Sequence, residues 1–309
     1  MKSTIAIVIP VYNREKLVLR SLESIARQSV MPKQLIVVDN NSTDNSYQSV
    51  KDWISVHPLA GVEMKLIAQP TPGAANARNA GFEQVATDYV YFLDSDDCAK
   101  PELVEEITKA AENYGNPELI LMDTAYADGR VKKYFHKDLL KAQLYQARIC
   151  TLTFAAQTDF FRKVGQWNGN LRCWDDWELG VRLLAQNPKM VVVDKVLSVI
   201  YPQAESITGE NHYSKAGEWE RAIDAAEEAV KNRKEANALR RMINYRRLNL
   251  AALYKQEGRS DLAIPLRKKA LEYPLVTKRE RIVLNLIYQF TSRGFRGGYI
   301  LYDYLVNLK

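Results

Sequence analysis

Cysteine is scarce in this sequence, which has only Cys98, Cys150 and Cys173 among its 309 residues. An odd number of cysteines at these irregular spacings fits neither a disulfide framework nor a cysteine-rich metal site. Proteins without structural disulfides are typical of reducing compartments. We therefore expect a cytoplasmic protein.

Long apolar runs are also lacking, since no stretch of about 18 apolar residues occurs and no transmembrane helix is predicted. The apolar segment at residues 5–11 is short, contains Pro10 and leads into polar residues without a cleavage site. We interpret it as a buried strand and not as a signal peptide. The net charge is +6, but the sequence contains no nucleic-acid-binding motif that would account for it. Solvation, an anionic membrane surface and a phosphorylated ligand remain three open explanations of that charge.

The first half of the chain alternates between short β-branched or aromatic runs and segments with helical periodicity. Apolar strands separated by helices indicate a parallel sheet that is covered on both faces, which is an α/β domain of the doubly wound type. In such sheets, ligands bind beyond the carboxyl ends of the strands. The strands are expected at residues 5–11, 34–39, 64–69, 88–94, 118–123 and 189–201, and the helices at 15–28, 46–56 and 74–86.

The last third of the chain reads as helix throughout, so we predict a domain at 1–212 and a small all-α region at 213–309. Within it, one segment has the spacing of a single tetratricopeptide unit. One unit is too little to be stable alone, so the hairpin is expected to dock on the first domain or on a second subunit. The aromatic and basic tail at 280–305 is expected to pack against the body or a dimer partner, or else to lie on a membrane surface. The residues of the tetratricopeptide-like pattern are Leu250, Ala251, Tyr254, Gly258, Ala263, Ala270 and Pro274.

Three carboxylates follow the strand that ends near Leu93: Asp94, Asp96 and Asp97. At positions i and i+2 of an extended strand end, Asp94 and Asp96 point to the same side. Two such carboxylates suit a hard divalent cation such as Mg²⁺ or Mn²⁺, which leaves positions open for phosphate oxygens. Asp97 is expected to face elsewhere and to cap the helix that begins near Pro101. A solvent-exposed acidic loop is the plainer alternative.

Four sequence blocks together resemble the family-2 inverting glycosyltransferases of the GT-A fold, over roughly residues 3–205. These are IPVYNRE at 9–15, VVDNNSTDNS at 37–46, GAANARNAG at 73–81 and FLDSDD at 92–97, in the family's order and spacing. The resemblance implies a Rossmann-like, mostly parallel sheet. It also implies metal-dependent transfer of a hexosyl or N-acetylhexosaminyl group from a nucleotide sugar, with UDP as the expected carrier. Bacterial polysaccharide or glycoconjugate synthesis is the implied setting.

The resemblance assigns roles to individual residues of these blocks. Asp39 would accept a hydrogen bond from the uracil ring, and Arg78 would face the nucleotide phosphates, where a guanidinium suits a pair of oxygens. A helix cap for Asp39 and a surface position for Arg78 are the plainer alternatives. The remaining assignments are a nucleotide pocket formed by Pro10, Val11 and Tyr12, nucleotide contacts from Asp94 and Ser95, and Mn²⁺ or Mg²⁺ held by Asp96 together with Asp94.

The catalytic base of the family stands in an acidic pair that opens a helix, and Asp175-Asp176 fits that pattern, with Asp176 as the base. The helix dipole would lower the pKa of this carboxyl, whereas an apolar wall of Trp174 and Trp177 would keep it basic. The two tryptophans are also candidates to stack on the acceptor sugar. Helix capping by the acids and ordinary core packing of the tryptophans are the alternatives.

One departure from the family pattern concerns YPQAESIT at 201–208. Tyr201, Ser206 and Thr208 are kept, but Pro202 and Ala204 stand where the family has an Arg and a His near the donor phosphates. His212 is a candidate substitute.

Two other functions are alternatives to the transferase. A sugar-nucleotide pyrophosphorylase would need a glycine-rich basic loop after the first strand, and PVYNRE is not one. A catalytically weak, transferase-like scaffold that binds partners through its helical region stays open. The expected partners are a nucleotide-sugar donor and a glycan or lipid-linked glycan acceptor. Peripheral contact with the inner face of the membrane and a homodimer through the C-terminal helices are further expectations, and no nucleic acid is expected.

Overall fold

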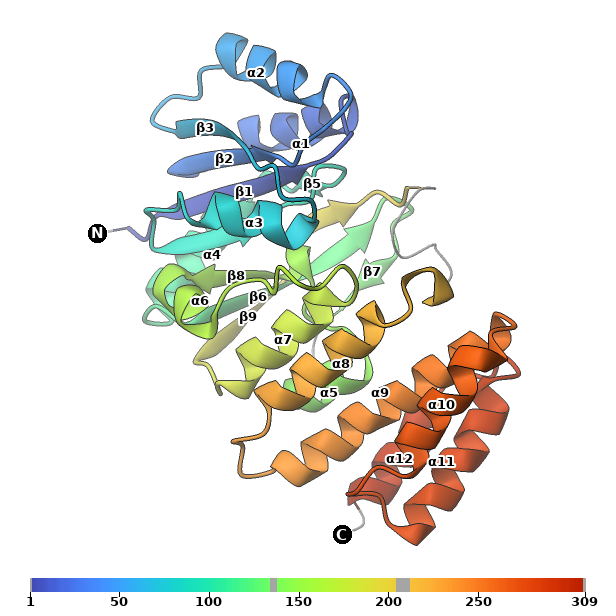
Figure 1. The fold of residues 1–309 in the computed structure, drawn as a ribbon. Coiled ribbons are helices and arrows are strands. Elements are labelled where there is room, and N and C mark those ends of the chain that lie inside the picture. Colours follow the sequence, from blue (N-terminus) through green and yellow to red (C-terminus); the bar gives the residue numbers. More distant parts are fainter. Residues whose placement is uncertain (1, 134–137, 204–211, 308–309) are drawn as a thin grey trace. The chain divides into compact units, whose positions relative to one another are not determined.

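The computed structural model describes residues 2–133, 138–203 and 212–307, which group into two compact units (Figure 1). Among these residues, the first unit contains the β-strands together with helices α1–α4 and α6. The second contains α5 and α7–α12. The α/β class and the helical C-terminal region are therefore confirmed, while the boundary between residues 212 and 213 stays a prediction.

The N-terminal half of the sheet is parallel, with the strand order β3-β2-β1-β4. Its strands are β1 (Ile5–Val11), β2 (Gln34–Asp39), β3 (Glu63–Ala68) and β4 (Tyr89–Phe92). The crossovers contain α1 (Leu17–Ala26), α2 (Ser46–Val56) and α3 (Ala74–Phe82). All seven elements overlap the predicted ranges, although α3 ends at Phe82, four residues before its predicted end. Polar residues that follow β1, β2 and β4 are thereby brought to one edge of the sheet.

The rest of the sheet is mixed. In the described residues, β8 (Phe154–Gln157) runs antiparallel between β4 and β6 (Leu119–Tyr126), and β9 (Met190–Ile200) runs parallel to β6. Two very short strands, β5 (Cys98–Ala99) and β7 (Val131–Lys132), pair antiparallel with β9 and β6. The sequence pattern predicts β6 and β9 but not β5, β7 or β8, which are too short to show a period. The connecting helices are α4 (Leu103–Asn113) and α6 (Thr158–Val164).

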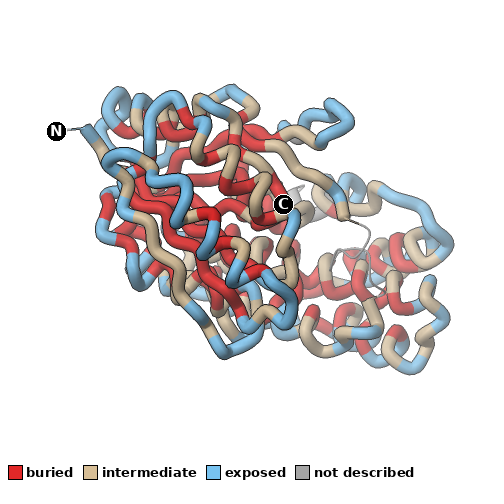
Figure 2. The backbone as a smooth tube through the Cα atoms, turned by 90° about the horizontal axis from the view of Figure 1, so that it is seen from above, coloured by how far each residue is buried: buried red, intermediate tan, exposed pale blue. Residues whose placement is uncertain are grey.

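Strands β1, β2 and β4 are buried along their whole length, as their uninterrupted apolar composition predicts (Figure 2). Ile7 and Ile9 of β1 share a core with α1, α2 and α4. Val8, which faces the opposite side, lies against α3. There α3 approaches closely because Gly81 has no side chain: a Cβ atom at this position would stand 2.4 Å from Val8 Cγ1 and 2.9 Å from Val38 Cγ2.

The variant Gly81→Ala is therefore expected to lower the free energy of unfolding by about 1–3 kcal/mol, as overpacking of a core does. Helix propensity alone would favour Ala over Gly by about 1 kcal/mol. Urea denaturation followed by circular dichroism measures the net effect. A variant as stable as the parent, or more stable, would show that α3 can move away from the sheet without cost.

The second unit is a set of packed helices. In the described residues it comprises α5 (Leu139–Tyr145), α7 (Asp175–Ala185), α8 (Glu218–Ala229), α9 (Ala236–Gln256), α10 (Ser260–Leu271), α11 (Lys278–Thr291) and α12 (Gly298–Asn307). Helices α9 and α10 form a hairpin around Gly258, whose φ of +77° suits glycine. None of the described helices combines the length and apolar character that crossing a membrane requires.

Residues of the tetratricopeptide-like pattern are buried in this hairpin, including Leu250, Ala251, Ala263 and Ala270. A buried Arg247 on α9 contacts Asp224 and Glu227 of α8, so its charge is compensated inside the bundle. The hairpin thus packs as part of a larger helical unit. Its membership of the tetratricopeptide class stays a prediction.

Candidate active site at the carboxyl ends of β1, β2 and β4

Asp39 is the last residue of β2 and lies beside Val11, the last residue of β1. Its carboxylate is buried, and Oδ2 accepts a hydrogen bond from the backbone N–H of Ser42 at 3.1 Å. The other oxygen, Oδ1, is buried without a hydrogen-bond partner. A buried acceptor without a partner is costly and requires an explanation. A ligand N–H that reached Oδ1 would supply the missing bond.

The predicted pocket residues of β1 differ in exposure. Pro10 and Val11 are buried in the strand, whereas Tyr12, the first residue after it, is 57% exposed. Only Tyr12 therefore presents a large free side chain beside Asp39. An exposed aromatic face of this kind can stack on a nucleobase.

The loops that follow β2 and β3 are held together by the side chain of Asn40. Asn40 donates to the backbone oxygens of Gln69 and Thr71, and its Oδ1 accepts from the N–H of Gly73. The buried Asn40 side chain thus holds the loop that leads into α3 against the end of β2. Our reading of the sequence missed this residue, although its place directly after Asp39 in the VVDNNS block is a usable signal.

Arg78 of α3 is buried and reaches the carboxylate that follows β4. Its Nη2 lies 2.7 Å from Asp94 Oδ1, and its guanidinium carbon lies 4.4 Å from the centroid of the Trp167 ring. The ion pair and the stacked ring hold the guanidinium in place. The predicted phosphate-facing role stays a prediction, but the structure does bring Arg78 together with one of the predicted metal ligands.

The segment Asp94-Ser95-Asp96-Asp97 is a turn and not an extended strand end. Strand β4 ends at Phe92, and the N–H of Asp97 donates to the backbone oxygen of Asp94 at 3.1 Å. We expected strand alternation to place Asp94 and Asp96 on the same side, and this reason is wrong because the segment is not a strand. The carboxylates are nevertheless close enough that the charge of Asp94 helps to raise the pKa of Asp96. Ser95 is buried within the turn.

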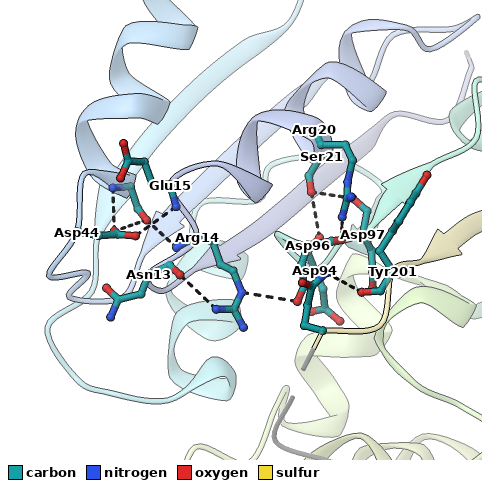
Figure 3. Close-up of polar contacts among 12 residues, drawn as sticks. Asn13, Arg14, Glu15, Arg20, Ser21, Asp44, Asp94, Asp96, Asp97 and Tyr201 are labelled. Carbon is teal, nitrogen blue, oxygen red and sulfur yellow. Dashed lines mark hydrogen bonds and ion pairs between the residues drawn. The ribbon is translucent and has the colours of Figure 1, made fainter. Parts of the chain in front are cut away.

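Asp97 has a structural role different from the predicted one. Its Oδ1 accepts a hydrogen bond from the backbone N–H of Tyr201 at 2.8 Å, which ties the turn to the segment after β9 (Figure 3). The residue that precedes α4 is Glu102, so the expected helix cap by Asp97 is wrong. Burial, followed by the neighbouring charge of Asp94, raises the pKa of Asp97 to about 8.

Two arginines flank Asp96, and our reading of the sequence assigned a role to neither. Arg14, which follows β1, places its Nε 3.6 Å from Asp96 Oδ2 (Figure 3). Arg20 of α1 donates to the backbone oxygen of Asp96 and stacks on the ring of Tyr201 at 3.7 Å. Burial and the charge of Asp94 raise the pKa of Asp96, while Arg14 acts against them. Arg14 could have been found from its place directly after the strand, whereas Arg20 lies in a helix with no visible signal.

The residues around Asp96 fit a divalent cation only in part. Among the residues that the structure describes, no group of three or more His, Cys, Asp or Glu side chains could hold a metal ion. Asp94 and Asp96 nevertheless supply two hard oxygen ligands whose mutual repulsion a cation would relieve. Their donor set fits Mg²⁺ or Mn²⁺ if diphosphate oxygens and water complete the coordination. Pro202 is exposed and brings no ligand, while Ala204, Ser206 and Thr208 lie outside the described residues.

The predicted base, Asp176, lies in the first turn of α7, in the second compact unit. Trp174, two residues earlier, has a φ of +53°, which is a strained conformation for a bulky residue. Asp175 and Asp176 are both partly exposed. The helix end thus carries two carboxylates next to a strained backbone, a combination that occurs at functional sites.

The two tryptophans near this helix end are engaged within the same unit. Trp177 is 0% exposed, and its indole N–H donates to the backbone oxygen of Gln143. The guanidinium carbon of Arg246 on α9 lies 4.0 Å from the Trp174 ring centroid and 4.4 Å from that of Trp177. These contacts describe core packing for Trp177 and leave only Trp174 partly exposed. The acceptor-stacking role of the pair stays a prediction.

His212 also has a partner within the second unit. Its Nδ1 lies 2.7 Å from Glu257 Oε1 at the end of α9, and its ring packs on Trp219 with centroids 5.2 Å apart. Glu257 additionally accepts from the backbone N–H groups of His212 and Tyr213. Glu257 therefore anchors the short helix at His212–Lys215. The idea that His212 substitutes for the family's metal-facing His stays a prediction.

Curated glycosyltransferases match parts of the chain. The glycosyltransferase GlyG of Streptococcus pneumoniae is 25% identical over 175 residues, which cover 55% of this chain and 53% of GlyG. The glycosyltransferase GlyA of the same organism is 29% identical over 133 residues, 43% of this chain and 18% of GlyA. The chain thus spans about half the length, or less, of these relatives.

Solved structures match almost the whole chain. The fragment 1–349 of S. aureus TarS, in complex with UDP-GlcNAc, superposes with a TM-score of 0.73 at 17% identity, covering 97% of this chain and 90% of the fragment. The mannosyltransferase PcManGT of Pyrobaculum calidifontis, in complex with GDP-Man and Mn²⁺, gives a TM-score of 0.59 at 17% identity, covering 100% and 88%. These likenesses confirm the predicted GT-A fold. The model of glycosyl transferase family 2 matches residues 6–163, which is half of the sequence, and the chain therefore belongs to that family.

Proposed function

We propose that this protein is a metal-dependent inverting glycosyltransferase that moves a hexosyl or N-acetylhexosaminyl group from a UDP-sugar to an acceptor hydroxyl. One observation carries the proposal: the buried Oδ1 of Asp39 has no hydrogen-bond partner and lies at the end of β2, near the exposed Tyr12. Uracil offers a ring N–H for that oxygen and an aromatic face for Tyr12. The complexes of TarS with UDP and UDP-GlcNAc support the choice of uridine.

The diphosphate of the donor would lie near Arg78, Asp94 and Asp96. A divalent cation, when bound, would neutralise the developing charge on the leaving diphosphate. In the described residues Asp94 and Asp96 are the carboxylates that would hold it, and Arg14 and Arg78 add positive charge on either side. The Mn²⁺ present in the PcManGT complex supports this part of the proposal. Ser95 and the Asp94 carboxylate would also contact the nucleotide.

The acceptor hydroxyl would lose its proton to Asp176. Deprotonation by a positioned carboxylate is general base catalysis, and attack from the face opposite the leaving group inverts the anomeric centre. This role rests on the motif that Asp176 matches and on its place in the first turn of α7. We place the enzyme in the cytoplasm, with a glycan or lipid-linked glycan as its acceptor.

A screen of nucleotide sugars tests the activity most broadly. Purified protein with Mn²⁺ is incubated with a panel of UDP-, GDP- and dTDP-sugars, and the released nucleotide is measured. Slow hydrolysis of one or a few UDP-sugars is expected, because water can replace the acceptor. Release from GDP-sugars alone would refute the uridine assignment, and release from none would favour the scaffold function.

The variant Asp39→Asn tests the uracil contact. An amide has one oxygen, so its NH₂ group must oppose either the Ser42 N–H or the ligand N–H. We expect UDP to bind roughly ten- to a hundredfold more weakly, since a hydrogen bond to a charged group contributes about 1.5–3 kcal/mol. Isothermal titration calorimetry gives the affinity, and Asp52→Asn on the exposed face of α2 is the matched control. Equal affinities of both variants for UDP would show that Asp39 does not contact the uracil ring.

A further inference from the structure

Helix α11 presents an exposed apolar ridge. Ile282, Leu286 and Phe290 follow one another at intervals of four residues and are 65%, 49% and 56% exposed. Their opposite helix face is buried in the second unit through residues such as Leu284 and Ile287. Exposed apolar side chains aligned in this way indicate an interaction surface.

Arginines stand at both ends of this ridge. Arg279 lies three residues before Ile282 on the same side of the helix and is exposed. Arg293 is exposed as well and lies just beyond the end of α11 at Thr291, where its guanidinium donates to the backbone oxygen of Gln289 at 2.6 Å. The span from Arg279 to Thr291, the last residue of α11, corresponds to roughly 18 Å along the helix axis. The large exposed side chains on this side between the two arginines are Ile282, Leu286 and Phe290.

The segment after α11 has the same chemistry. Phe295 is 62% exposed and lies between Arg293 and Arg296, both also exposed. Its ring packs against Phe290 with centroids 5.9 Å apart, so it continues the ridge. Glycines at 294 and 297, with φ of +94° and +92°, shape the turn that presents it. On α12, Ile300, Leu301 and Tyr304 are exposed as well.

The charges of this segment are mostly positive. Between residues 278 and 307 the sequence has five cationic side chains and two carboxylates, Glu280 and Asp303. Both carboxylates are engaged: Glu280 pairs with Arg241 at 2.9 Å and Asp303 with Lys141 at 2.8 Å. The surface therefore offers apolar groups and cations, with no exposed carboxylate from this segment.

This charge distribution selects among the occupants of the ridge. A second copy docked through a two-fold axis would bring the same surface against itself, and its arginines would meet other arginines. An anionic lipid surface instead offers phosphates to Arg279, Arg293 and Arg296 and acyl chains to the apolar ridge between them. Large apolar side chains flanked by cations are what interfacial helices present to membranes.

We propose that the exposed face of α11, with Phe295, docks on an anionic lipid surface. The inference goes beyond the proposed sugar transfer and does not depend on it. In such docking, Ile282, Leu286, Phe290 and Phe295 enter the boundary between head groups and acyl chains, while the three arginines contact the lipid phosphates.

Co-sedimentation of the full chain with vesicles tests the proposal. Phosphatidylcholine vesicles are compared with vesicles that also contain phosphatidylglycerol, and sedimentation with the anionic vesicles only, weakened by salt, is expected. The triple variant I282S/L286S/F290S and the double variant R279E/R293E should each lose most of this binding. For the double variant a loss of at least tenfold is expected, because each cation near such a surface contributes roughly fivefold.

Matched control variants distinguish binding through this surface from non-specific binding to vesicles. Val56→Ser changes an exposed apolar residue of the first unit, and Arg27→Glu reverses the charge of an exposed arginine directly after α1. Both should sediment like the parent, and thermal melting should show every variant folded. Absence of vesicle binding by the parent, or equal binding by the triple variant, would overturn the proposal. A parent that is dimeric by sedimentation velocity and becomes monomeric in the triple variant would assign the ridge to a second copy instead.

Discussion

Replacing Asp176 with Asn is expected to remove sugar transfer while leaving donor binding intact. The amide is nearly isosteric with the carboxylate but cannot accept the proton of the acceptor hydroxyl. General base catalysis contributes about 10²–10⁴-fold to rates, so kcat should fall by a factor in that range. Calorimetry should give the same UDP affinity as the parent, because Asp176 belongs to α7 of the second unit and to none of the donor-binding blocks.

The neighbouring Asp175→Asn is the matched control for this prediction. Both carboxylates lie in the first turn of α7 and interact with its dipole, so a purely structural or capping role would make the two variants alike. If Asp176 is the base, only Asp176→Asn loses turnover by orders of magnitude. Retained turnover in Asp176→Asn, or an equal loss in both variants, would show that the base is another residue.

The second large effect is expected from Asp96→Ala, which removes the carboxylate that stands between Asp94 and Arg14. Turnover should fall roughly 10²–10³-fold, as when a stabilising group for transition-state charge is lost. UDP binding should in addition lose its dependence on Mn²⁺, because the remaining Asp94 is already paired with Arg78. Titrations of UDP with Mn²⁺ and with EDTA measure this dependence.

Asp159→Ala provides the control for Asp96→Ala. Asp159 is an exposed carboxylate of α6 in the same compact unit, and it contacts only Arg162 of its own helix among the contacts that the structure gives. Its removal should change neither turnover nor the Mn²⁺ effect. If Asp96→Ala kept a Mn²⁺-dependent UDP affinity, the metal would have to be held elsewhere, or by the nucleotide alone.

The sequence predicts the parts of this fold that have strong periodicity. Strands β1, β2, β3 and β4 and helix α2 are found at or near their predicted bounds, because buried parallel strands are apolar throughout and helix stripes repeat regularly. Since these strands run parallel, their carboxyl ends necessarily meet at one edge. That geometry alone brings Tyr12, Asp39 and Asp94 to the same edge of the sheet.

Other features depend on contacts between distant residues and leave little trace in the local sequence. The turn at 94–97 is held by Arg20 and by the N–H of Tyr201, more than 100 residues away, so strand alternation was the wrong guide there. Asp97 accepts that hydrogen bond, and the residue that precedes α4 is Glu102. In the same way, α7 packs against α5 and α8, and this grouping with the helical unit could not be read from the motif around Asp176.

Titration of the parent protein with UDP, with and without Mn²⁺, tests the central claim most directly. We expect saturable binding of UDP that strengthens when Mn²⁺ is present. Binding of CDP should be much weaker, because cytosine has an acceptor where uracil offers the N–H that Asp39 Oδ1 would receive. Absence of UDP binding under both conditions, or equal affinity for UDP and CDP, would contradict it.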